Sequence, residues 1–169
     1  TEEDPIPLPI DPGPDSDTGN RGVPTALRAL AISPDGDTLY VGGTVANIAR
    51  GLVYDGTPLG FDVTLRATVR VVDLATRTER FEERKQLDNH GTIDALALSP
   101  LGNWLWVAHA GTHTLERLDA YTLRAAGVIL DAGQGIDGLA LTPDGATLVV
   151  HAALDRELRL YDVADPSVP

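Results

Sequence analysis

The sequence contains no cysteine and no methionine, and aromatic residues occupy only 5% of its 169 positions. Without cysteine the chain cannot form a disulfide, a thiolate zinc site, an iron–sulfur cluster or a CxxCH haem attachment. We therefore predict no cofactor held through sulfur within this chain. Any haem c would have to belong to a partner or to a domain outside this sequence.

Basic residues are also scarce, at 13 against 25 acidic residues, which gives a formal net charge of −12. This charge repels polyanions and argues against nucleic acid or an anionic membrane as a partner. No apolar run approaches the ~18–20 residues that a membrane-spanning helix requires. The opening Thr1 to Asp4 lacks the positive charge and apolar stretch of a signal peptide, although a processed N-terminus would look the same.

Proline is concentrated near the start of the chain, at Pro5, Pro7, Pro9, Pro12 and Pro14. Each proline fixes φ and lacks an amide donor, so the segment is expected to be extended and polyproline-like. We interpret residues 1–24, distinct from residues 25–169, either as an acidic linker or as an arm that lies on a neighbouring surface.

Two apolar segments joined by a Ser/Thr-Pro-x-Gly turn occur three times, over residues 29–41, 95–107 and 138–150. Proline presets φ for such a turn and glycine tolerates the positive φ that ends it, so each copy predicts a tight hairpin. The copies are expected to place three prolines in equivalent turns, Pro34, Pro100 and Pro143. They are also expected to bury three equivalent leucines, Leu39, Leu105 and Leu148.

A further strand that closes on aspartate follows each hairpin, at residues 68–73, 114–119 and 157–162. One more short strand lies between copies, at 81–87 and 125–130, and we expect it to be the innermost of its blade. Four strands per unit, with Pro100 and Pro143 separated by 43 positions, fit the ~40–50-residue period of propeller blades better than a generic sandwich.

The sequence thus predicts an all-β fold: a partial β-propeller of about three four-stranded antiparallel blades with an extended Pro-rich N-terminal arm. The expected blades cover about 25–88, 89–131 and 132–169. The first contains an insertion of about twenty residues, 46–67.

The turn Ser33 to Gly36, the strand Leu39 to Val41 and the strand Val69 to Asp73 resemble the YVTN-type bacterial β-propeller repeat. This resemblance extends over roughly residues 26–166. Several parts of the insertion are similar to a block in propellers that accompany di-haem c-type cytochromes of the cytochrome c peroxidase and methylamine-utilisation type. They are residues 47–51, 55–56, 58–59, Phe61 and residues 64–67. The resemblance implies a c-type cytochrome partner and a periplasmic or extracellular location.

The insertion mixes apolar anchors with charges, which is the composition of a contact patch more than of a solvated tether. We predict that it is ordered and docks a partner. The residues expected to make this contact are Ile48, Arg50, Tyr54, Asp55, Phe61 and Arg66.

All four histidines fall in loops, or at strand ends, that a propeller brings to one face together with the insertion. Neutral imidazole is a common ligand of copper and zinc, so a copper or zinc site is one hypothesis for this face. The alternative is ordinary loop histidines, because the sequence places no carboxylate beside them. The candidate ligands are His90, His109, His113 and His151.

Three blades do not close a ring, since propellers have about four to eight. Open ends expose strand edges and apolar blade faces, so we expect a non-catalytic interaction or scaffold module that another domain or subunit completes. One alternative is a fragment of a propeller lactonase or hydrolase with a metal in its channel, which segments 81–87 and 125–130 disfavour because they share no ligand position. Another is a structural surface-layer or filament component.

Overall fold

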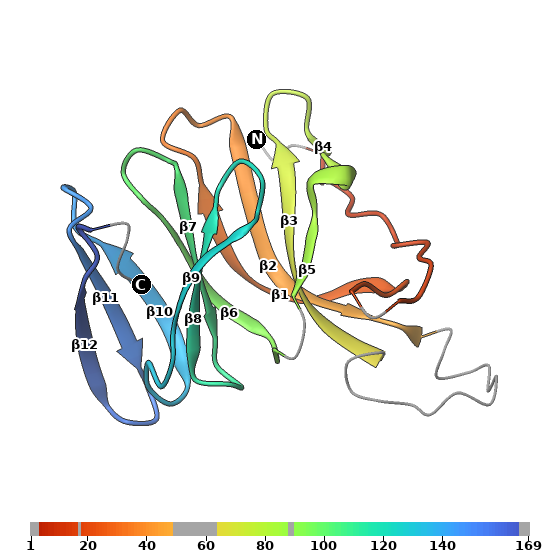
Figure 1. The fold of residues 1–169 in the computed structure, drawn as a ribbon. Coiled ribbons are helices and arrows are strands. Elements are labelled where there is room, and N and C mark those ends of the chain that lie inside the picture. The colour runs from red at the N-terminus through yellow and green to blue at the C-terminus, as the bar shows by residue number, and fades with distance from the viewer. Residues whose placement is uncertain (1–3, 17, 49–63, 88–89, 166–169) are drawn as a thin grey trace.

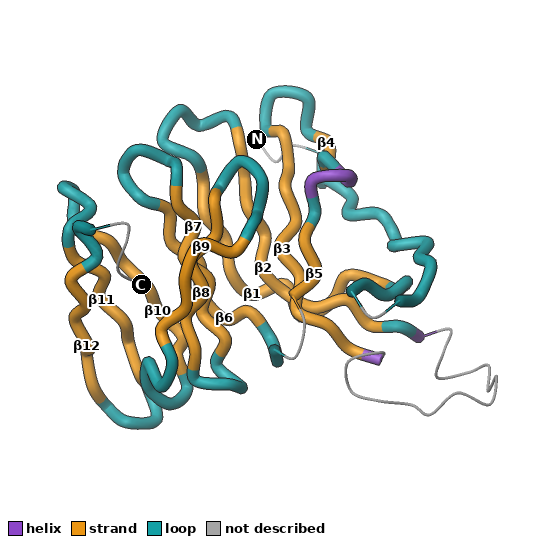
Figure 2. The backbone as a smooth tube through the Cα atoms, in the orientation of Figure 1, coloured by secondary structure: helices purple, strands orange, loops and turns teal. Residues whose placement is uncertain are grey.

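A computed structural model describes residues 4–16, 18–48, 64–87 and 90–165 of the chain. The described strands form three antiparallel sheets that stand side by side (Figure 1). Strands and loops alternate along almost the whole tube (Figure 2). Among the described residues, no helix has the length and apolar character needed to cross a bilayer. The architecture is a partial β-propeller, as the repeat predicts.

The first blade contains β1 (Val23–Ile32), β2 (Thr38–Ala46), β3 (Leu65–Asp73), β4 (Thr78–Glu79) and β5 (Lys85–Leu87). Both β4 and β5 pair with β3, and a 3-10 turn, Phe81–Glu83, separates them. A continuous strand over 81–87 was expected, so this part of the prediction is wrong. The turn is held by Arg84, whose guanidinium donates to the Phe81 carbonyl at 2.7 Å and lies over the Phe81 ring.

The second blade follows the expected order β6-β7-β8-β9, and the third contains β10-β11-β12. The second-blade strands are β6 (Ile93–Leu98), β7 (Trp104–His109), β8 (Thr114–Asp119) and β9 (Ala125–Ile129). The third-blade strands are β10 (Ile136–Leu141), β11 (Thr147–Ala152) and β12 (Glu157–Asp162).

The innermost strands differ from those expected. Neighbouring blades meet mainly through β1, β6 and β10, whereas β5 and β9 lie at the opposite edge of their sheets. Segments 81–87 and 125–130 are therefore outer, not inner. The sequence repeat has the same length whichever of the four strands is taken as the first of a blade. The spacing of the repeat therefore does not show which strand lies nearest the propeller axis.

Two apolar cores fill the spaces between successive blades. In β7, Leu105 and Val107 face the first blade, while Trp106 and Ala108 face the third. The alternation follows from the two-residue period of a strand, which sends successive side chains to opposite faces. Leu105 and Leu148 are fully buried as predicted. Leu39 is only half-buried, because it lies on the face of the first blade against which no described blade packs.

The three Ser/Thr-Pro-x-Gly turns are equivalent, as predicted, and lie along one edge of the three sheets (Figure 1). In each turn the glycine amide donates to the Ser or Thr carbonyl, closing a tight turn. Two of the turns also contact the next blade: Pro34 lies against Gly102, and Pro100 against Gly145. Gly36 has no such neighbour, since no described blade precedes it.

We expect Gly102→Ala to destabilise the chain more than Gly36→Ala. Both glycines have positive φ, 71° and 82°, where an L side chain costs roughly 1–2 kcal/mol. A Cβ at Gly102 would lie 2.9 Å from Pro34 Cδ, whereas a Cβ at Gly36 meets nothing within 4 Å. Overpacking should add about 1–3 kcal/mol at Gly102 alone. Urea unfolding of both variants tests this, and equal losses of stability would contradict the blade contact.

The Pro-rich arm folds back onto the outer part of the first blade rather than extending away (Figure 1). Its Asp11 is buried and accepts from Arg84 at 2.8 Å and from Gln86 at 3.1 Å. Burial would raise the pKa of Asp11, but the hydrogen bonds from Arg84 and from the Gly13 amide lower it below its ordinary value. Gln86 also exchanges two 2.7 Å hydrogen bonds with the backbone of Asn20, so the arm is tied to β5 at two points.

Candidate functional site

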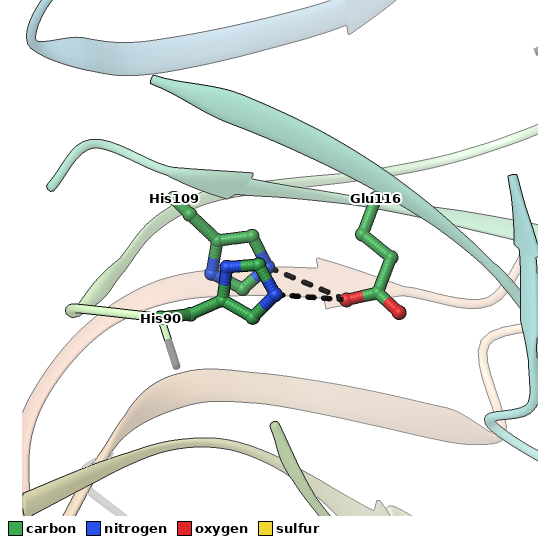
Figure 3. Close-up of side chains that lie close together, drawn as sticks. All are labelled: His90, His109 and Glu116. Carbon is green, nitrogen blue, oxygen red and sulfur yellow. Dashed lines mark ion pairs between the residues drawn. The ribbon is translucent and has the colours of Figure 1, made fainter. Parts of the chain in front are cut away.

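A cluster of three titratable side chains, His90, His109 and Glu116, lies at the loop edge between the first and second blades (Figure 3). His109 ends β7 and Glu116 lies on β8, where the hairpin register pairs Val107 with Glu116 and His109 with Thr114. Glu116 shares a face with its partner Val107, and His109 lies two residues further along β7 on that same face. Val107 faces the first blade, so His109 and Glu116 do so as well. His90 comes from the loop before β6.

The two imidazole rings stack with centroids 3.9 Å apart and an interplanar angle of 16°. The Nε2 atoms of His109 and His90 lie 3.5 and 3.9 Å from Oε2 of Glu116. Nδ1 of His90 lies 3.3 Å from Oγ1 of Thr112, which fixes the ring from its other side. Both imidazoles thus direct one nitrogen at the same carboxylate oxygen (Figure 3).

His109 has no exposed surface, and neither of its ring nitrogens has a hydrogen-bond partner among the described residues. Oε2 of Glu116 is likewise buried without a hydrogen bond. Most buried polar atoms in proteins are hydrogen-bonded, so such a group calls for an explanation.

Of the four histidines predicted as ligands, the structure brings His90 and His109 together, and His113 and His151 lie outside the cluster. His151 pairs instead with Asp137, with Nδ1 2.6 Å from Oδ1. Sequence analysis missed Glu116. The sequence could have indicated Glu116, because the hairpin register that pairs His109 with Thr114 places Glu116 on the same face of the sheet as His109.

The innermost strands contain a repeated polar position, occupied by Arg28, Asp94 and Asp137. In each blade it lies where the register of the inner hairpin shifts, a bulge that re-aims the side chain. Arg28 donates to Asp94 at 2.8 Å, and Asp137 pairs with His151. Within the described part of the chain, these carboxylates do not gather into a ligand set of the kind a channel metal requires.

Two of the six predicted docking residues of the insertion, Ile48 and Arg66, lie among the described residues. Ile48 is exposed, as a contact residue would be, whereas Arg66 is buried and does not form free surface. Arg50, Tyr54, Asp55 and Phe61 lie outside the described residues. The docking role of the insertion therefore stays a prediction.

Both ends of the blade stack expose apolar side chains that are buried at equivalent positions inside it. On the first blade Leu27, Leu30 and Ile32 form what we call the first-blade face; Leu30 is 66% exposed, whereas its equivalent Leu96 is 8% exposed. The arm residues Ile6 and Leu8 line a groove of about 300 Å³ together with Leu27 and Leu30 of this face. The arm thus covers the outer half of this blade and leaves the inner strand open.

The opposite end mirrors this arrangement. Ala140, Val149, Leu158 and Leu160 share one side of the third sheet, which we call the last-blade face. Leu158 is 65% exposed, while its equivalent in the second blade, Leu115, has no exposed surface. In the interior, the equivalents of the last-blade face pack against the equivalents of the first-blade face, once in each core. The two ends are therefore the two complementary halves of one repeated interface.

Comparison with known proteins supports the fold alone. No family model matches the sequence, and no curated protein matches it. Among solved structures, hydrazine synthase of Kuenenia stuttgartiensis superposes with a TM-score of 0.68 at 14% identity over 83% of this chain and 46% of that one. A functionally unknown protein of Desulfotomaculum acetoxidans gives 0.59 at 14% identity over 83% of this chain and 39% of its own.

The WD40 repeats of RRP9 also give a TM-score of 0.59, at 12% identity over 82% of this chain and 36% of that one. Similarity at such low identity, to WD40 repeats among others, supports the β-propeller fold and no particular function. This chain spans less than half the length of each of these three solved chains.

Proposed function

We propose that this chain is a non-catalytic interaction module that joins other propeller blades through its first-blade and last-blade faces. The observation that carries the proposal is the equivalence between each exposed end and a blade interface that is buried twice inside the molecule. The occupant of each face is a blade of the same repeat, because only such a blade presents the complementary half.

The two faces differ from each other, so the contact is head-to-tail. A head-to-tail contact generates a closed ring if its rotation closes and a filament if it does not. In a closed arrangement two copies of this chain would supply six blades, within the range found for propellers. The scaffold role and the surface-layer or filament alternative thus depend on the same contact and differ only in closure.

The identity of the natural partner is a finer proposal, supported by the resemblance of the turns and the insertion to YVTN-type repeats that accompany di-haem c-type cytochromes. On this proposal haem c belongs to the partner, since the chain has no cysteine to attach it. The location would be periplasmic or extracellular. The net charge of −12 favours a partner with a basic surface.

Blocking each face separately tests the proposal. We expect the unmodified chain to associate with rising concentration in sedimentation velocity. Leu30→Glu with Ile32→Glu blocks the first-blade face, and Leu158→Glu with Leu160→Glu blocks the last-blade face, so each double variant alone should remain monomeric. An equimolar mixture of the two should form a heterodimer, because one intact pair of faces remains between them.

Leu101→Asp is the matched control, since Leu101 is the most exposed of the large apolar side chains in the described part of the chain and lies in a turn away from both faces. It also restores the aspartate found at the same turn position in the other blades, Asp35 and Asp144. We expect it to associate as the unmodified chain does. A monomeric unmodified chain, or a mixture in which no heterodimer forms, would contradict the proposal.

A further inference from the structure

We propose that His90, His109 and Glu116 bind one divalent transition-metal ion of the zinc class at the edge between the first two blades. Two imidazoles and one carboxylate form a ligand set that holds zinc in proteins and leaves a fourth position open. The ligand atoms of the three residues all lie within 4.8 Å of one another. The proposal is independent of the docking faces, because none of the three residues belongs to either face.

The first argument is the set of unsatisfied buried atoms. Among the described residues, no hydrogen-bond partner is found for either ring nitrogen of the fully buried His109, or for the buried Oε2 of Glu116. Leaving buried polar atoms unpaired is costly, whereas coordination of one cation would satisfy a nitrogen of His109 and the Glu116 oxygen together. A bound cation would also place a positive charge next to the Glu116 carboxylate, between the two imidazoles.

The second argument is distance. Ligand atoms around a tetrahedral zinc with bonds of about 2.0–2.1 Å are separated by roughly 3.3 Å. The two Nε2 atoms lie 3.5 and 3.9 Å from Oε2 of Glu116, so only a small contraction is required. The stacked rings must also tilt until their lone pairs converge. His90 is the ligand expected to shift, by exchanging its contact with Thr112, since it lies in a loop while His109 and Glu116 lie on paired strands.

The third argument is that the fold does not require these side chains. At the position of His109 the first and third blades have Gly43 and Ala152, and at the position of Glu116 they have Arg70 and Arg159. Small or cationic residues thus suffice for blade packing. The histidine–glutamate combination is confined to the second blade, as expected of a site added to a repeat.

The fourth argument is the space next to the cluster. A cavity of about 280 Å³ is lined by His90 and Glu116 together with Thr18, Lys85, Gln86 and Leu87. This volume leaves room for a water molecule or a small anion at the open coordination position. Lys85 supplies a positive charge suited to an anionic fourth ligand.

Calorimetric titration of the tag-free, chelator-treated chain with Zn²⁺ tests the proposal. We expect one ion per chain with a dissociation constant in the micromolar range or below, and tetrahedral absorption bands when Co²⁺ is used instead. His109→Ala should fold, since Ala152 occupies the equivalent position, and should weaken binding at least tenfold. Glu116→Gln and His90→Ala should each weaken it by a similar factor.

His151→Ala is the matched control, because His151 also lies beside a carboxylate but is exposed and outside the cluster. It should bind Zn²⁺ as the unmodified chain does. No saturable binding by the unmodified chain, or binding that survives His109→Ala and is lost in His151→Ala, would overturn the assignment. Circular dichroism of each variant separates lost binding from lost folding.

Discussion

Glu79→Ala is expected to lower the free energy of unfolding by about 3–5 kcal/mol, because it would leave the buried Arg70 guanidinium without its counter-ion. Both side chains are almost fully enclosed, and Nη1 of Arg70 donates to the two Glu79 oxygens at 2.9 and 2.8 Å. Burial raises the pKa of Glu79 and lowers that of Arg70, in each case against the attraction of the partner. Both charged groups have therefore lost most of their hydration, and each depends on the other for compensation.

The enclosure depends on the arm, whose Pro9 carbonyl accepts from Arg70 at 3.1 Å. The matched control is Glu83→Ala, which removes a 3.7 Å ion pair with Arg80 at the surface and should cost less than about 1 kcal/mol. Urea unfolding, followed by the fluorescence of Trp104 and Trp106, measures both at one chain concentration. A loss for Glu79→Ala no larger than that for Glu83→Ala would show that the pair is not enclosed as described.

Leu96→Ala and Leu30→Ala should have opposite consequences although they change equivalent residues of the same type. Leu96 is buried between the first two blades, so its truncation should cost about 2–5 kcal/mol of stability. Leu30 is exposed, so its truncation should change stability by less than about 0.5 kcal/mol in the dissociated chain. Its effect should instead appear as weaker self-association.

Unfolding at low chain concentration and sedimentation at high concentration separate these two effects. If Leu30→Ala destabilised the dissociated chain as much as Leu96→Ala does, the first-blade face would already be covered within the chain. If it left association unchanged, this face would not be where another blade docks.

Much of the fold follows from the repeat alone. The spacing of the turn prolines gives the hairpins, and the observed bounds of β8 and β12 are those predicted. The error at Leu39 has a simple cause: the repeat makes it equivalent to Leu105 and Leu148, but burial depends on a preceding blade, and none is described before β1. A local pattern specifies the strand and the face, not what covers that face.

The position of the arm and the membership of the histidine cluster were not predicted from the sequence. Proline content predicts an extended arm, but its place on the first blade depends on the specific pairing of Asp11 with Arg84 and Gln86 across more than seventy residues. Such a long-range polar contact has no local signature. For the cluster, all histidines were predicted as ligands because they are histidines, which included His113 and His151 although both lie outside it. The pairing of strands β7 and β8 would have identified Glu116 instead.

The most direct test of the central claim is disulfide trapping of the head-to-tail contact, for which the absence of cysteine gives a clean background. Inside the molecule, a Cβ at Gly42 would lie 3.2 Å from Cβ of Ile93, close to the Cβ separation in a disulfide. The equivalent positions on the open ends are His151 and Leu27. Gly42→Cys with Ile93→Cys is the intramolecular control.

Chains with Leu27→Cys and chains with His151→Cys are oxidised separately and as an equimolar mixture, then separated by non-reducing electrophoresis. Head-to-tail docking predicts a covalent heterodimer of about twice 17.9 kDa in the mixture and little dimer from either chain alone. A mixture that stays monomeric while the intramolecular control closes, or dimers formed equally by one variant alone, would contradict the claim that the two ends are halves of one blade interface.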